Sequence, residues 1–175
     1  MRIKIYADGA NLEEIKSLSK KKEIIGFTTN PSLMAKSGVK DYEAFAKEVI
    51  EILEDKPLSL EVFSDDITEM EKQAKIISSW SNSVYVKIPV TNSKGEFTSD
   101  IIKRLSNDGV KLNITAIFTL PQVDSTIENL SNEVPSIISI FAGRIANTGI
   151  DPMEIMIDSV NKAAKKSTLI EILWA

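Results

Sequence analysis

The 175-residue sequence contains neither cysteine nor histidine. The absence of cysteine excludes disulfides and thiolate nucleophiles, and the absence of histidine excludes Ser-His-Asp triads. Together the two absences remove the ligands that most zinc sites use. Any catalytic chemistry must therefore depend on lysine, carboxylate and hydroxyl groups.

Long apolar runs and basic tracts are also missing. No run approaches the length needed to cross a membrane, and the first residues alternate polar and apolar side chains instead of resembling a targeting segment. The net charge is −4, the pI is about 5.0, and no basic stripe with interleaved aromatics occurs. We therefore expect a cytoplasmic protein that binds neither membranes nor nucleic acid.

Seven short apolar runs alternate with stretches in which apolar residues recur at helical spacing, as at Ile67, Met70 and Ala74. The runs, which we predict to be strands, are Ile3–Asp8, Ile25–Thr28, Leu58–Val62, Val84–Ile88, Lys111–Ile117, Ile137–Phe141 and Thr168–Trp174. Strand followed by helix, repeated, predicts an α/β fold with a parallel sheet. No linker or composition shift divides the chain, so we expect residues 1–175 to form one domain.

The number of repeats favours a (β/α)8 TIM barrel over half of a doubly wound fold. Such barrels usually have about 250 residues and rarely fewer than about 200. We therefore expect a TIM barrel that is truncated after the seventh strand.

Polar residues occupy one face of four predicted strands, although strands covered by helices should be apolar on both faces. Alternation places Ser59 with Glu61 in the third strand and Tyr85 with Lys87 in the fourth. The same parity turns further polar residues inward in the first and fifth strands, namely Tyr6, Asp8, Asn113 and Thr115. Each strand carries such a residue toward its C-terminal end, the rim where barrel enzymes assemble their active sites.

Two interpretations of Lys87 are open. It could pair with Glu61 or Asp8 as a structural ion pair, or it could be a catalytic amine. Buried ion pairs seldom stabilise more than apolar packing does, so an amine among carboxylates, amides and hydroxyls favours chemistry. The ordinary pKa of lysine is about 10.4, and desolvation lowers the pKa of an amine so that some of it is free to attack a carbonyl.

Five motifs occur in register along the chain. They are Tyr6–Asn11 (YADGAN), Gly26–Ser32 (GFTTNPS), Val86–Pro89 (VKIP), Asn113–Phe118 (NITAIF) and Ser139–Ile145 (SIFAGRI). Together they resemble the transaldolase family, over Ile3–Ala175. The resemblance implies a transferase of the pentose phosphate pathway, needing no metal or other cofactor. Such an enzyme transfers a dihydroxyacetone unit from sedoheptulose 7-phosphate or fructose 6-phosphate to an aldose phosphate through a lysine Schiff base.

The resemblance also implies catalytic roles. Lys87 matches the lysine that forms the Schiff base. Asp8 matches the carboxylate that handles the proton of the sugar hydroxyl during bond cleavage, with a cap for the loop at Gly9 as the structural alternative. Glu61 and Thr115 match the pair that holds a catalytic water beside the Schiff base.

Five further residues match the family's substrate contacts. Asn30 and Asn113 match residues that bind substrate hydroxyls, although Asn30 could equally cap the helix that follows it. Ser139 resembles a substrate-contacting serine and Phe141 a pocket-lining residue, and buried packing is the alternative for both. Arg144 resembles the phosphate-binding arginine, and a solvated surface arginine is the alternative.

Two positions distinguish transfer from cleavage. Fructose 6-phosphate aldolases resemble this sequence but carry glutamine where Glu61 stands and tyrosine where Phe141 stands. A tyrosine hydroxyl can help protonate the enamine and release dihydroxyacetone, whereas phenylalanine leaves the enamine for an aldehyde. The sequence therefore favours transaldolase, with fructose 6-phosphate aldolase as the alternative.

The end of the sequence departs from the family. Helix 7, strand 8 and helix 8 of the barrel are missing, as is a serine or similar residue that helps bind phosphate. A lone barrel of this kind would have open edges on its first and seventh strands. Three explanations stay open: a fragment of a longer protein, a homo-oligomer whose sheet a partner subunit completes, or an inactive barrel. The sequence alone does not rank the three. As a separate prediction, we expect the protein to form a homo-oligomer.

Overall fold

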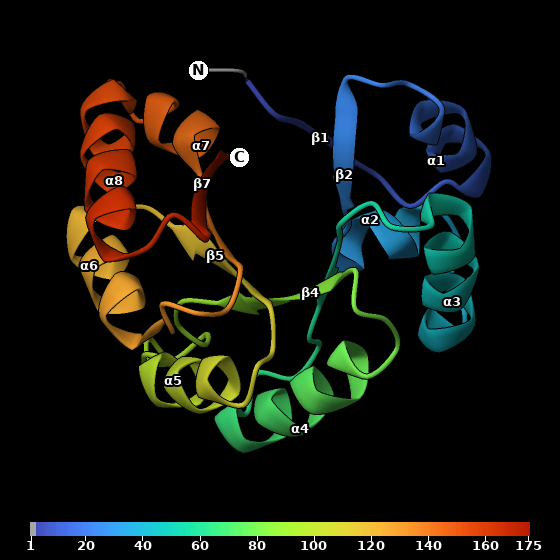
Figure 1. Cartoon of the computed structure of the whole chain (residues 1–175), viewed down its shortest axis with the longest axis horizontal. Helices are drawn as coiled ribbons and strands as arrows, with labels where there is room; N and C mark the ends of the chain where they lie inside the picture. Colours follow the sequence, from blue (N-terminus) through green and yellow to red (C-terminus); the bar gives the residue numbers. More distant parts are fainter. Residues whose placement is uncertain (1–2) are drawn as a thin grey trace.

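The computed structural model describes residues 3–175, in which seven strands alternate with helices (Figure 1). The strands are β1 (Ile5–Asp8), β2 (Ile24–Thr28), β3 (Leu58–Glu61), β4 (Val84–Pro89), β5 (Leu112–Ile117), β6 (Ser136–Ile140) and β7 (Ile170–Trp174). The helices are α1 (Leu12–Ser19), α2 (Pro31–Lys36), α3 (Tyr42–Leu53), α4 (Ile67–Ser78), α5 (Ser99–Asn107), α6 (Leu120–Asn129), α7 (Ala142–Ala146) and α8 (Met153–Lys166). All seven predicted strands are confirmed, and no end differs by more than two residues.

The strands form one parallel sheet in the order β1-β2-β3-β4-β5-β6-β7. Figure 1 shows the sheet curled, with the helices arranged around its outer side. This α/β architecture is a half-barrel of the truncated TIM-barrel type, so the predicted fold class is confirmed. β1 and β7 are the two edges of the sheet, and within residues 3–175 neither pairs with a further strand.

Branched apolar residues on the outer face of the strands pack against the helices. In β3 and β4 the residues Leu60, Val86 and Ile88 have no exposed surface. Met70 and Ala74 of α4 are equally buried, which confirms the predicted helical stripe. Burying one Leu, Ile or Val side chain stabilises a fold by roughly 1.5–3 kcal/mol, so this layer accounts for much of the folding free energy.

Side-chain caps set the starts of the first four helices. Asn11, Asn30, Asp41 and Asp66 each accept a hydrogen bond from the backbone N–H three residues later. Such caps satisfy N–H groups that have no partner inside the helix, each worth about 1 kcal/mol. Asn11, Asn30 and Asp66 fix the points where the chain turns from a strand into the next helix, whereas Asp41 marks the passage from α2 into α3.

The inner face of the sheet carries its own side chains. Near the N-terminal ends of the strands the ring of Tyr6 lies over Gly26, where a Cβ would sit 2.4 Å from Tyr6 Cε1. Burial, and then the charge of Glu171, raises the pKa of Tyr6, and the same two causes raise the pKa of Tyr85. Tyr6, Tyr85 and Glu171 therefore form the floor of the half-barrel, below the C-terminal mouth.

β5 contains an irregularity close to this mouth. Its register with β6 shifts between Ile114 and Ile117, and Ala116 has a φ of 59°, in the left-handed region. A bulge of this kind bends the strand and changes the direction of its side chains. The bulge directly follows Thr115, one of the predicted site residues.

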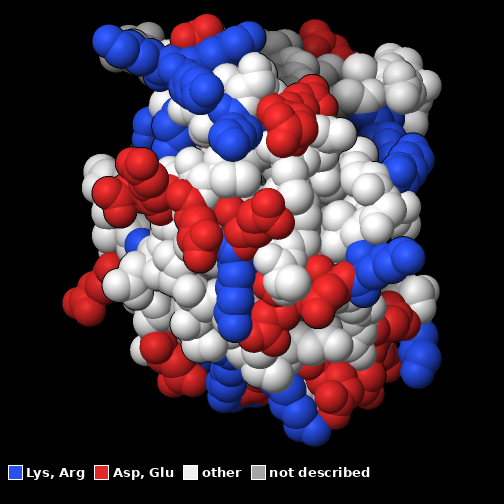
Figure 2. Space-filling view, turned by 90° about the vertical axis from the view of Figure 1, so that its right-hand side faces the viewer, with Lys and Arg blue, Asp and Glu red and all other residues white. Residues whose placement is uncertain are grey.

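The surface carries charges of both signs. On the face shown in Figure 2, Lys and Arg side chains are interspersed with Asp and Glu side chains. Among residues 3–175 no helix combines the length and the apolar character needed to cross a membrane.

Candidate active site

The parallel register brings the predicted catalytic residues to one end of the sheet. Glu61 is paired with Lys87, and Lys87 with Asn113, on three successive strands. Thr115 lies beside the last residue of β4, and Asp8 is the last residue of β1. Because paired residues in a parallel sheet point to the same face, these side chains converge on the interior at the C-terminal mouth.

Lys87 is held between the ends of β2 and β3. The residue is only 8% exposed, its Nζ lies 3.2 Å from Glu61 Oε2, and it donates a hydrogen bond of 3.0 Å to the main-chain oxygen of Thr29. The side chain points into the interior and away from the helical layer, as the strand parity predicted. A buried amine beside a carboxylate can lose a proton to it, which is what attack on a carbonyl requires.

Asp8 lies at the open edge of this interior, on the edge strand β1, and the residue is exposed. Partial desolvation raises the pKa of the Asp8 carboxyl above its ordinary value of 3.8, while the positive charge of Lys87 opposes the shift. Among residues 3–175 nothing donates a hydrogen bond to this carboxylate, and the cap of α1 is Asn11 instead. The capping alternative for Asp8 therefore has no support in the geometry, and the carboxylate is left available for a ligand.

A chain of buried hydrogen bonds crosses the interior beside Lys87. Ser139 Oγ donates to Asn113 Oδ1 at 2.7 Å, and Asn113 Nδ2 donates to Ser59 Oγ at 3.0 Å. All three residues are at most 3% exposed. The chain fixes the orientation of the Asn113 amide and leaves its second N–H available for a substrate hydroxyl. Ser139 thus has an internal partner, as the packing alternative predicted.

Thr115 is buried at 3% exposure, and its hydroxyl makes no hydrogen bond to another described residue. Asn30 confirms the capping alternative, since its Oδ1 accepts from the N–H of Leu33 at 3.0 Å. The cap engages only the amide oxygen of Asn30, so the NH₂ group of the same side chain can still donate to a ligand.

Phe141 and Arg144 lie where β6 passes into α7. The Phe141 ring meets Phe118 edge to face, with centroids 5.4 Å apart, and the guanidinium of Arg144 lies 6.0 Å from the centre of the Phe141 ring. Arg144 is exposed, and no salt bridge joins it to another residue in the described part of the chain. Its charge is free to meet an anionic group at the mouth.

Three contacts at the site were not predicted from the sequence. The carbonyl of Thr29 accepts from Lys87, Ser59 accepts from Asn113, and the hydroxyl of Tyr42 donates to the main-chain oxygen of Glu61 at 3.0 Å. The parity of β3 had placed Ser59 on the inner face without a role. Main-chain acceptors leave no signal in residue identity, so the other two contacts could not be read from the sequence.

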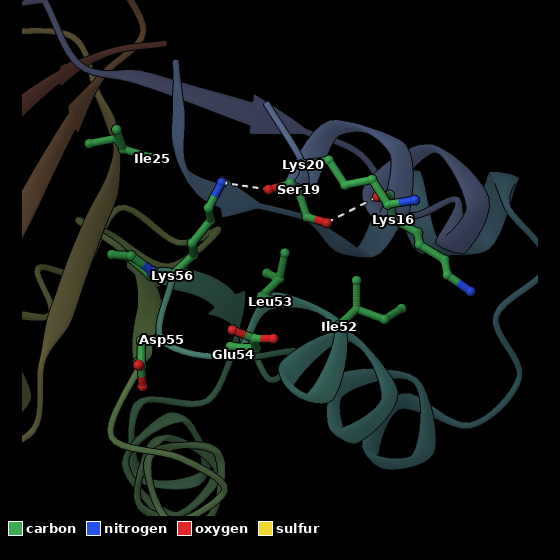
Figure 3. Close-up of a pocket in the computed structure, with 10 residues that line it drawn as sticks. Lys16, Ser19, Lys20, Ile25, Ile52, Leu53, Glu54, Asp55 and Lys56 are labelled. Carbon is green, nitrogen blue, oxygen red and sulfur yellow. Dashed lines mark hydrogen bonds between the residues drawn. The ribbon is translucent and has the colours of Figure 1, made fainter. Parts of the chain in front are cut away.

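A second hollow lies at the opposite end of the sheet, between the C-terminal ends of α1 and α3 (Figure 3). Lys56 lines it and donates to three main-chain oxygens, those of Ser19 (2.7 Å), Lys21 (3.2 Å) and Ile24 (2.7 Å). An ammonium has three donors, so all of them are engaged. Lys56 therefore anchors the ends of α1 and β2 and does not compete with Lys87 as a nucleophile.

Fold and site together define an α/β half-barrel with a buried lysine at the C-terminal ends of its strands. Among residues 3–175 no group of three or more carboxylates is placed to hold a metal ion. The arrangement suits amine chemistry on a small carbonyl compound bound at the mouth.

Comparison with known proteins assigns the chain to a family. Residues 5–174 match the family model described as transaldolase/fructose-6-phosphate aldolase. A probable transaldolase of Dehalococcoides mccartyi is 36% identical over 159 residues, which are 91% of this chain and 70% of that protein. A probable transaldolase of Roseiflexus castenholzii is 34% identical over 170 residues, 96% of this chain and 74% of that protein.

A third relative, a probable transaldolase of Streptococcus equi subsp. zooepidemicus, is 35% identical over 156 residues, covering 89% of this chain and 68% of its own length. The chain belongs to the transaldolase/fructose-6-phosphate aldolase family. The resemblance seen in the sequence motifs is confirmed, and the function is of the transaldolase or aldolase type.

Proposed function

We propose that this chain is a transaldolase that acts through a Schiff base on Lys87. The observation that carries the proposal is the position of the Lys87 amine, buried at the mouth of the half-barrel and 3.2 Å from the Glu61 carboxylate. A lysine in this position can be deprotonated locally and can reach a carbonyl that enters from the mouth. Sugar phosphates fit the family as substrates.

Schiff-base formation uses Lys87, Glu61 and Thr115. Glu61 accepts a proton from the ammonium, and the free amine attacks C2 of the ketose to give a carbinolamine. Proton transfer back through a water held by Glu61 and Thr115 then expels the C2 hydroxyl as water. The product is an iminium that joins C2 to Lys87, with the buried mouth limiting its hydrolysis.

Bond cleavage uses Asp8. Its carboxylate takes the proton of the C4 hydroxyl, the C3–C4 bond breaks, and the electron pair moves into the iminium to give an enamine. The shorter aldose phosphate leaves. The enamine carbon then attacks the aldehyde of the acceptor, Asp8 returns the proton to the new hydroxyl, and hydrolysis of the iminium releases the product ketose.

Substrate contacts come from the groups that have unused donors. The free N–H groups of Asn30 and Asn113 serve the substrate hydroxyls, and the exposed guanidinium of Arg144 serves the phosphate. Ser139 orients Asn113 in this proposal and also borders the dihydroxyacetone unit. The assignment to the pentose phosphate pathway, and to a homo-oligomer, belongs to the same proposal.

The test is covalent trapping. The protein is incubated with fructose 6-phosphate, reduced with borohydride and digested, and the peptide that contains Lys87 is examined for an added dihydroxyacetone unit. Lys87→Met is the inactive control, and Lys56→Met is the matched control at a lysine whose ammonium bonds to main-chain oxygens away from the site. Absence of the adduct in the native protein would leave the non-catalytic barrel as the better description.

The alternative function is fructose 6-phosphate aldolase. Phe141 has no hydroxyl with which to protonate the enamine, so we expect little free dihydroxyacetone unless an acceptor is absent for long periods. Fructose 6-phosphate is supplied with and without erythrose 4-phosphate, and both products are quantified. Phe141→Tyr is expected to increase release without acceptor. Rapid release by the native protein would favour the aldolase.

A further inference from the structure

The first residue of α3 contacts the strand that carries Glu61. The Tyr42 hydroxyl donates a hydrogen bond of 3.0 Å to the main-chain oxygen of Glu61. Glu61 is the last residue of β3, and its carboxylate is the one beside the Lys87 amine. Tyr42 therefore contacts the backbone of Glu61, a proposed catalytic residue, and not its reacting carboxylate.

The carbonyl of Glu61 needs this donor because β2 ends too early to provide one. Only two residue pairs join β2 to β3, Phe27 with Leu58 and Thr28 with Ser59. The N–H of Thr29 then bonds to the carbonyl of Ser59. The next position on that side of the chain is Pro31, which has no N–H to give. A carbonyl left without a partner costs free energy, and the phenol supplies the missing bond.

The Tyr42 ring is fixed from two other sides. Phe63, two residues beyond Glu61, meets it edge to face with centroids 4.7 Å apart, and Trp80, two residues after α4 ends, does so at 5.5 Å. Edge-to-face pairs stabilise the position of a ring beyond what simple burial provides. Burial, followed by the charge of Glu61, raises the pKa of Tyr42, so the phenol remains a hydrogen-bond donor throughout the working pH range.

We propose that Tyr42 is a positioning residue that holds Glu61 within reach of the Lys87 amine. The inference rests on the proposed function, because it concerns the proton transfers assigned to Glu61. On the β4 side, the N–H of Val62 bonds to the carbonyl of Lys87 at 3.1 Å, so only the β2 side depends on Tyr42. Without the phenol the end of β3 loses its tether on that side, and the carboxylate samples positions farther from the amine.

The experiment is a double-mutant cycle on Tyr42 and Glu61. Tyr42→Phe keeps the ring and its aromatic contacts and is expected to lower kcat for transfer about tenfold, with a smaller change in KM. The matched control is Tyr85→Phe, at a half-buried tyrosine whose hydroxyl bonds to no other described residue, and it is expected to leave kcat within about twofold. In a Glu61→Gln background, Tyr42→Phe is expected to have no further effect, because the carboxylate that it positions is gone.

A variant that restores a hydrogen-bond donor at position 42 without a phenol hydroxyl extends the test. Placing 4-aminophenylalanine at position 42 restores an N–H directed at the same carbonyl and is expected to recover most of kcat. Thermal unfolding of each variant shows whether the fold is retained. The inference is overturned when Tyr42→Phe behaves like Tyr85→Phe, or when it costs the same factor with and without Glu61.

Failure of the proposed function is recognised separately. Borohydride trapping at Lys87 in the native protein reports on that function alone. A protein that is trapped normally and yet is indifferent to Tyr42→Phe contradicts only the role of Tyr42. A native protein that is not trapped contradicts both proposals.

Discussion

Removing the charges of Lys87 and Glu61 together tests whether this buried ion pair serves catalysis or the stability of the fold. At 3.2 Å the attraction between the two charges is about 5 kcal/mol at an effective dielectric constant near 20. Taking each ion out of water costs several kcal/mol, so the pair contributes close to zero net stability. A pair of this kind is expected to be expendable for folding and indispensable for the reaction.

The single variant Lys87→Met is expected to be destabilised. It leaves the Glu61 carboxylate without its cation, and uncompensated buried charges cost about 3–5 kcal/mol. The Glu61 side chain keeps 19% of its surface exposed, which reduces the cost to roughly 2–3 kcal/mol by solvation. Glu61→Gln is expected to cost less, because the Lys87 ammonium retains its bond to the Thr29 carbonyl.

The double variant Lys87→Met/Glu61→Gln carries no buried charge. The remaining cost is the Thr29 carbonyl without its donor, about 1 kcal/mol. We therefore expect the free energy of unfolding, measured in urea at pH 7, to lie within about 1 kcal/mol of the native protein. No covalent trapping is expected in either variant that lacks Lys87. A double variant more than about 3 kcal/mol less stable than the native protein would show that the pair is retained for structure.

Three further predictions concern stability. Desolvation raises the pKa of Asp8 above 3.8, so the folded state binds that proton more tightly than the unfolded chain does. The native protein therefore loses stability as the pH rises from 3.8 through the higher pKa of the folded state. Asp8→Asn is therefore expected to raise the Tm more at pH 7 than at pH 4, and equal shifts at both pH values would contradict the sign. Gly26→Ala places a Cβ 2.4 Å from the Tyr6 ring and is expected to cost about 1–3 kcal/mol in urea unfolding, whereas the control Gly143→Ala, whose Cβ would lie 3.9 Å from its nearest neighbour, should change little. Ala116→Gly removes the left-handed strain of a φ of 59° and is expected to stabilise the protein by up to about 1 kcal/mol, and a loss of stability would show that the strain is absent.

Strand positions could be predicted from the sequence because two periodicities alternate. Runs such as Leu58–Val62 are short and apolar on alternate positions, and the stretches between them repeat every three or four residues, which only strand and helix geometry produce. Predicted strand ends differ from the observed ones where pairing with the neighbouring strand stops. β1 begins at Ile5 and not at Ile3, because Ile3 is exposed and pairs with no residue of β2.

Within the site, the inner residues could be predicted and their partners could not. Strand parity identified Glu61, Lys87 and Asn113 as neighbours, and the register confirms this. The contact between Lys87 and the Thr29 carbonyl involves an atom that every residue has, so no sequence pattern marks it. The Tyr42 ring packs against the apolar core, but no residue pattern marks the bond that its hydroxyl makes to the Glu61 carbonyl.

The interior also shows why parity alone does not identify an active site. Tyr85 and Lys87 share a face of the same strand, two residues apart, yet Tyr85 belongs to the floor with Glu171 and Lys87 to the mouth with Glu61. At the floor, Gly26 leaves room for the Tyr6 ring to lie against the sheet, and packed side chains fill the space. At the mouth the strands end, helices begin, and donors such as the second N–H of Asn113 remain unused. Chemistry is therefore expected at the end of the sheet where the backbone stops supplying partners, and not simply wherever polar residues turn inward.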